Sequence, residues 1–186
     1  MERFAKVQTA IKKIIKKSPL EWDLLHAQKT LFWLLKLNPE ADEILKIAAL
    51  AHDLERGVTG ITETTHLKNL SNLKEFKREH AKRSSEIIGA LVKAYDYSPA
   101  EITRLKKIVE NHEVGGDQET DILRDADSIA YFDQHIEKYY QRNGAIKTKD
   151  KISFMFDRVS DPAKQIIKQL KYKNSEVTQL VAEVVR

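Results

Sequence analysis

The chain has 186 residues, of which 41% are hydrophobic and 32% charged, and it carries a formal net charge of +4 at pH 7. This length supports one sizeable core and is short for two stable domains, so we expect a single domain over residues 1–186. Cysteine is absent, which excludes disulfides and thiolate chemistry and leaves imidazole and carboxylate as metal ligands. The modest charge gives no argument for a nucleic-acid partner but is compatible with an anionic substrate.

The sequence gives no sign of membrane insertion or secretion. No apolar run approaches the roughly 20 residues that a membrane-spanning helix needs, and the N-terminus lacks the apolar segment of a signal peptide. We therefore expect no membrane partner and a cytoplasmic location.

Apolar residues recur at helical spacing along the chain, and no segment alternates as a strand does. Ser18-Pro19 and Ser98-Pro99 have the order of an N-cap followed by a first-turn proline. The longest loop is expected after Gly57, in a polar stretch. We predict an all-α, single-domain helical bundle whose helices cover about residues 2–17, 19–36, 39–54, 72–95, 99–113, 119–142, 147–158, 161–171 and 174–185.

Two aspartates lie where the helical pattern asks for apolar residues. Asp53 follows His52 at the end of the apolar run 47–51, and Asp127 lies in the largely apolar run 123–130. An ionised carboxylate is costly to bury unless a cation or strong donors meet it. Both positions therefore predict a compensating partner inside the fold.

Three further histidines share the apolar side of their helices. His80 and His112 lie on apolar stripes, and His26 lies between two tryptophans at helical spacing. A single buried histidine is more often a hydrogen-bonded core residue than a metal ligand. Several inward imidazoles and two inward carboxylates in one small domain favour a shared cation, because each burial carries its own penalty.

The order of His26, His52-Asp53 and Asp127 resembles the HD superfamily of metal-dependent phosphohydrolases. Two short motifs carry this resemblance: Ala-Leu-Ala-His-Asp-Leu at 49–54 and Asp-Ala-Asp-Ser-Ile at 125–129. Two further motifs are similar to segments of family members that bind two metals: Glu-His-Ala at 79–81 and Val-Glu-Asn-His at 109–112. The resemblance covers about residues 20–135, on which helices within 147–186 would pack in an HD-type domain.

The resemblance implies one or two divalent metals per chain, with Mn, Mg, Co, Ni, Zn and Fe all open. Metal-activated water would cleave a phosphate ester of a nucleotide or another small phosphorylated metabolite. The implied metal ligands are His26, His52, Asp53, His80, His112 and Asp127.

Other side chains near these motifs are candidates for catalysis and substrate binding. Asp53 and Glu55 are the predicted catalytic residues, although Glu55 could equally face solvent at a helix end. Cationic side chains suited to phosphate oxygens are Lys29, Arg56, Arg83 and Arg124. Surface ion pairing is the alternative for each of these four.

Two other functions stay open at this point. The same six-ligand set resembles that of HD-type di-iron oxygenases, which iron content and oxygen consumption would distinguish from hydrolases. A non-catalytic helical binding module would need no tight metal. The substrate, the native metal and the oligomeric state are undetermined, and a homo-oligomer is compatible with the sequence.

Overall fold

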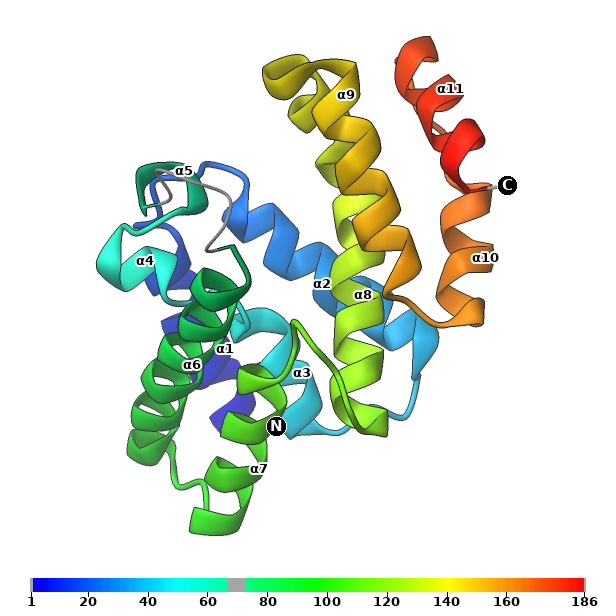
Figure 1. The fold of residues 1–186 in the computed structure, drawn as a ribbon. Coiled ribbons are helices and arrows are strands. Elements are labelled where there is room, and N and C mark those ends of the chain that lie inside the picture. Colours follow the sequence, from blue (N-terminus) through cyan, green and yellow to red (C-terminus); the bar gives the residue numbers. More distant parts are fainter. Residues whose placement is uncertain (1, 67–72, 186) are drawn as a thin grey trace.

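The computed structural model describes residues 2–66 and 73–185, and helices joined by turns make up this part of the chain (Figure 1). No strand occurs within these residues, so the predicted all-α bundle is confirmed. The helices are α1 (Glu2–Ile15), α2 (Asp23–Leu37), α3 (Glu43–Ala51), α4 (Arg56–Thr59), α5 (Glu63–His66), α6 (Leu73–Val92), α7 (Pro99–Glu110), α8 (Gln118–Gln134), α9 (Ile136–Asp157), α10 (Asp161–Gln169) and α11 (Ser175–Val184), with a short 3-10 helix, η2 (Lys93–Tyr95).

The core consists of two apolar clusters that meet along α2. One cluster surrounds the buried helix α3 and takes residues from α1, α2, α6 and α7. The other joins the C-terminal half of α8 to α9, α10 and α11, which lie together on one side of Figure 1. Trp33 and Leu37 of α2 pack against both clusters. Helix α2 therefore lies between the two parts of the core and packs along α8.

The start of α2 differs from the prediction. Ser18 does not cap it, because the hydroxyl of Ser18 accepts from the backbone N–H of Leu20 and donates to the carboxylate of Asp23. Residues 18–22 consequently form a turn, and the helix begins at Asp23. The other Ser-Pro start is as predicted: Ser98 and Glu101 form a capping box at the start of α7.

The His-Asp pair lies in a turn just beyond α3 and not inside a helix reaching residue 54. Asp42 caps the start of α3 by accepting from the N–H of Leu45, and the helix ends at Ala51. The Nδ1 atom of His52 is 2.9 Å from the carbonyl oxygen of Ala49. This contact satisfies a carbonyl at the helix end and fixes the orientation of the imidazole ring.

Gly57 lies inside α4 and does not end the preceding helix as predicted. A Cβ atom at this position would lie 2.3 Å from the carbonyl oxygen of Ile14, so the glycine permits close packing of α4 on α1. The left-handed residue that ends α4 is Gly60. Of the predicted loop after Gly57, residues 61–66 include α5, and residues 67–72 lie outside the described residues.

The predicted helix 119–142 is divided at His135, where α8 ends and α9 begins. Gly144 has a left-handed φ of 75° and kinks α9, which is the break that the sequence predicted before residue 147. None of the described helices combines the length and apolarity required to cross a bilayer.

Candidate metal centre

The six predicted metal ligands converge in the interior from separate parts of the chain. They form two groups, and within each group the ligand atoms lie within 4.8 Å of one another. The first group is His26 of α2, His52 after α3 and Asp127 of α8; the second is Asp53 after α3, His80 of α6 and His112 after α7. Both groups could hold a metal ion.

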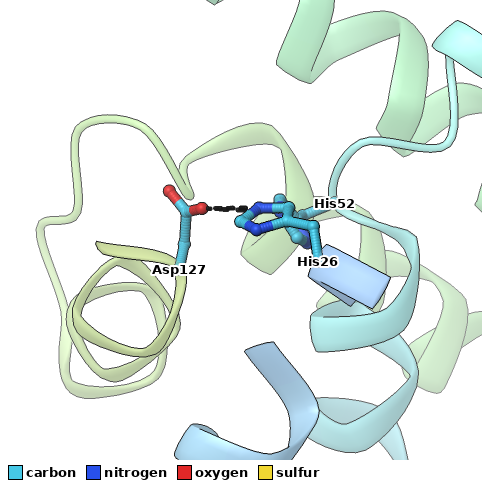
Figure 2. Close-up of side chains that lie close together, drawn as sticks. All are labelled: His26, His52 and Asp127. Carbon is cyan, nitrogen blue, oxygen red and sulfur yellow. Dashed lines mark hydrogen bonds and ion pairs between the residues drawn. The ribbon is translucent and has the colours of Figure 1, made fainter. Parts of the chain in front are cut away.

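The first group is compact and buried. The Nε2 atom of His26 lies 2.9 Å from Oδ1 of Asp127 and 3.2 Å from Nε2 of His52, and Figure 2 shows these side chains directed toward one another. Two ring nitrogens at 3.2 Å cannot both carry a proton without repulsion. A cation held by both nitrogens and the carboxylate would satisfy all three atoms.

Asp53 lies between the two groups. Its Oδ1 atom is 2.7 Å from Nε2 of His80, in the second group. Its Oδ2 atom is 3.8 Å from Nε2 of His26 and 3.6 Å from Nε2 of His52, in the first group. One carboxylate thus presents an oxygen to each set of imidazoles, as a carboxylate bridging two metals would.

The other ring nitrogen is held by an oxygen atom in three of the four histidines. The Nδ1 atoms of His52 and His112 lie 2.9 and 2.7 Å from the carbonyl oxygens of Ala49 and Val109. The Nδ1 atom of His80 lies beside the carboxylate of Glu55. Such contacts place the proton on Nδ1 and leave Nε2 as a lone-pair donor, which is the arrangement of metal-bound histidine.

Electrostatics favour the metal-binding protonation state at Asp127 and at His112. Burial would lower the pKa of His26 and His80, but the carboxylates beside these two imidazoles raise it. Burial alone would raise the pKa of Asp127, but the His26 hydrogen bond and the charge of Arg158 hold it well below its usual range. Burial lowers the pKa of His112 to about 4. An ionised carboxylate and a neutral imidazole are the forms that bind a metal ion.

Glu55 is fully buried and supports His80. Its two oxygens bond separately, one to Nδ1 of His80 and the other to the guanidinium of Arg83. The alternative that Glu55 faces solvent at a helix end is therefore wrong. Its predicted catalytic role stays a prediction, and its contacts are those of a residue that orients a ligand.

Each cation predicted to bind phosphate already has a partner. Arg56 pairs with Asp53 and Asp23, while Arg83 pairs with Glu55. Lys29 pairs with Asp133 at 3.0 Å, and Arg124 donates to the carbonyl oxygen of Val114 and pairs with Asp121. The structure shows that these four cations interact with protein groups. Their roles in binding phosphate stay predictions.

Sequence reasoning missed a buried chain of charges beside the first group. Arg158, the residue that follows α9, donates to Oδ2 of Asp127 at 2.6 Å and to Glu113 at 2.7 Å. Lys77 of α6 donates to the same Glu113 carboxylate at 2.8 Å. Burial opposes ionisation of Glu113, but Lys77 and Arg158 keep its pKa far below the usual value. The position of Glu113 directly after His112 could have pointed to it in the sequence. No feature of the sequence pointed to Arg158.

His135, which follows α8, lies beside the site. Its ring centroid is 5.0 Å from that of His26, and its Nε2 is buried without a hydrogen-bond partner among the described residues. Neither of its nitrogens belongs to the two ligand groups. The contact with His26 arises where α2 packs along α8.

The family model described as "Domain of unknown function (DUF4202)" matches residues 5–181. The chain therefore belongs to this family. A search of curated proteins and a search of solved structures both gave no match.

Proposed function

We propose that this protein is a metal-dependent phosphohydrolase of the HD type, which uses metal-activated water to cleave a phosphate ester of a nucleotide or another small phosphorylated metabolite. The observation that carries the proposal is the position of Asp53, whose two oxygens face two separate groups of imidazoles. Paired metals bridged in this way are suited to hydrolytic displacement at phosphorus.

The residues have distinct roles in this proposal. His26, His52 and Asp127 hold one metal, His80 and His112 hold the other, and Asp53 bridges them. When bound, the metals supply Lewis-acid chemistry, lowering the pKa of water and offsetting charge on the phosphoryl oxygens. Glu55 fixes the ring of His80, and Arg158 fixes the carboxylate of Asp127.

The proposal is tested with a panel of phosphate esters, including nucleotides, supplied separately with Mn, Mg, Co and Ni. We expect phosphate release with at least one metal, and its loss in a His52→Asn variant that removes an Nε2 ligand. A control is Lys149→Gln, which removes an exposed ion pair with Glu183 outside both ligand groups. Activity that survives His52→Asn would contradict the proposal.

The same preparation distinguishes the rival functions. Tightly bound iron with substrate-dependent oxygen consumption and no phosphate release would favour the oxygenase. Failure to bind any of the metals would favour a non-catalytic binding module. The proposal favours hydrolysis because basic side chains adjoin the metal groups and suit an anionic ester.

A second prediction concerns the number of metals. Wild-type protein should bind close to two Mn ions per chain after mild loading, because each group brings three ligand atoms within 4.8 Å of one another. The double variant His80→Ala, His112→Ala should bind about one ion, since it retains the first group. Elemental analysis measures both, and an unchanged metal content in the double variant would exclude the second group.

A further inference from the structure

Lys151 of α9 is a half-buried cation without a carboxylate partner. No aspartate or glutamate among residues 2–66 and 73–185 forms an ion pair with it, and the segment 67–72 contains no acidic residue. Its ammonium lies instead over two aromatic rings, 5.7 Å from the centre of Tyr131 and 5.6 Å from that of Phe154. A cation held in this way retains its capacity to bind an anion.

Lys151 contacts aromatic rings that lie near residues of the first metal group. Tyr131 is one helical turn beyond Asp127 on α8. The ring of Phe154 also contacts Lys77 and Arg158, at 4.7 and 5.5 Å. Arg158 in turn bonds to Asp127. Shared contacts thus connect the ammonium of Lys151 to the edge of the first ligand group.

The neighbouring cations are neutralised, whereas Lys151 is not. Arg158 uses its three nitrogens on Ser128, Glu113 and Asp127, and Lys77 shares Glu113 with it. Burial and the nearby charge of Lys77 lower the pKa of Lys151, as expected for a cation that lacks a counter-ion. Phe154 is 44% exposed, so one of the two rings that frame Lys151 faces solvent in part.

We infer that Lys151, framed by Tyr131 and Phe154, binds the phosphoryl group of the substrate, and that the substrate is a phosphate monoester. This inference rests on the proposed function. An extra unpaired cation next to a metal centre favours the dianion of a monoester over the single charge of a diester. Lys151 is a binding residue in this arrangement, and the ligand positions of the metals are unaffected by it.

The first test measures binding without catalysis. Inorganic phosphate is titrated calorimetrically into Mn-loaded protein, and Mn is titrated into metal-free protein, for wild type, Lys151→Met and Lys149→Met. Lys149 is an exposed lysine of the same helix, paired with Glu183, and serves as the matched control. We expect Lys151→Met to weaken phosphate binding roughly tenfold or more while Mn affinity stays unchanged. Lys149→Met should leave both affinities unchanged.

The second test separates this inference from the proposed function. With aryl phosphate monoesters and diesters as probes, Lys151→Met should lower kcat/KM for the monoester at least tenfold more than for the diester. Ester hydrolysis with an unchanged monoester preference in Lys151→Met would overturn the inference and leave the hydrolase standing. Phosphate binding that depends on Lys151, without hydrolysis of any ester, would retain the subsite and reject the hydrolase. Equal phosphate affinity in wild type and Lys151→Met, or none in either at millimolar phosphate, would overturn the subsite.

Discussion

Asp53→Asn should reduce the stabilisation of the folded protein by Mn, because both metal groups would lose an anionic oxygen. It should also lower hydrolytic activity by about 10³-fold or more, because several kcal/mol of metal-derived stabilisation of the transition state would be lost. The neutral amide cannot offset the charge of two cations or bridge them with two anionic oxygens. In wild type, a metal at about 100 times its Kd stabilises the folded state by about 2.7 kcal/mol. Thermal unfolding with chelator and with excess Mn, together with activity, measures the effect.

The matched control is Asp23→Asn. Asp23 is a buried carboxylate that pairs with the same Arg56 as Asp53 does, at 3.4 Å, but it belongs to neither ligand group. This variant should lose stability and keep the full response of the melting temperature to Mn. If Asp53→Asn also kept that response, Asp53 would be a structural partner of Arg56, and the bridging role would be lost.

Arg158→Met should destabilise the metal-free protein by about 3–5 kcal/mol, the cost of leaving a buried ion pair without one partner. The guanidinium is bonded to both Asp127 and Glu113, and the side chain is only 10% exposed. Excess Mn should recover part of the loss, because the metal neutralises Asp127. Denaturant unfolding of wild type and Arg158→Met, each with and without Mn, measures these differences.

A double-mutant cycle gives the control for Arg158. Adding Glu113→Gln to Arg158→Met removes the charge of a carboxylate that has lost one of its two cationic partners. The double variant should therefore be more stable than the sum of the single effects predicts. Additive losses would mean that Arg158 stabilises the fold through packing alone. The position of Asp127 would then not depend on the charge chain.

The sequence by itself determined the helical character and most of the residues that converge. Helical periodicity and caps depend on contacts three or four residues apart, so the capping box at Ser98 and the break at Gly144 were readable. The inward placement of His80, His112 and Asp127 followed from polar residues on apolar faces. Burial costs constrain such positions locally, whatever lies opposite them.

Only the tertiary structure decided how these charges are compensated. The sequence argument left Asp53 in need of a partner, and packing supplied Arg56 and His80 in addition to the first-group imidazoles. The motif at 125–129 contains two aspartates with different partners. Asp127 forms an ion pair with His26, whereas Asp125 accepts a hydrogen bond from the backbone N–H of Ser160. Their different partners come from α2 and from the start of α10, which are distant in the chain.

Tertiary packing also formed the charge chain from Lys77 through Glu113 to Arg158. It likewise placed Lys151, which has no ion-pair partner among the described residues. Lys151 lies on α9 and Arg158 directly follows it, both beyond the motif-bearing segment. Lysine and arginine side chains usually face solvent. The burial of these two results from α9 packing along α8, an interaction between surfaces that no local spacing encodes. Short sequence motifs thus indicate which residues could bind a metal. The side chains that orient those residues depend on which helix faces pack together.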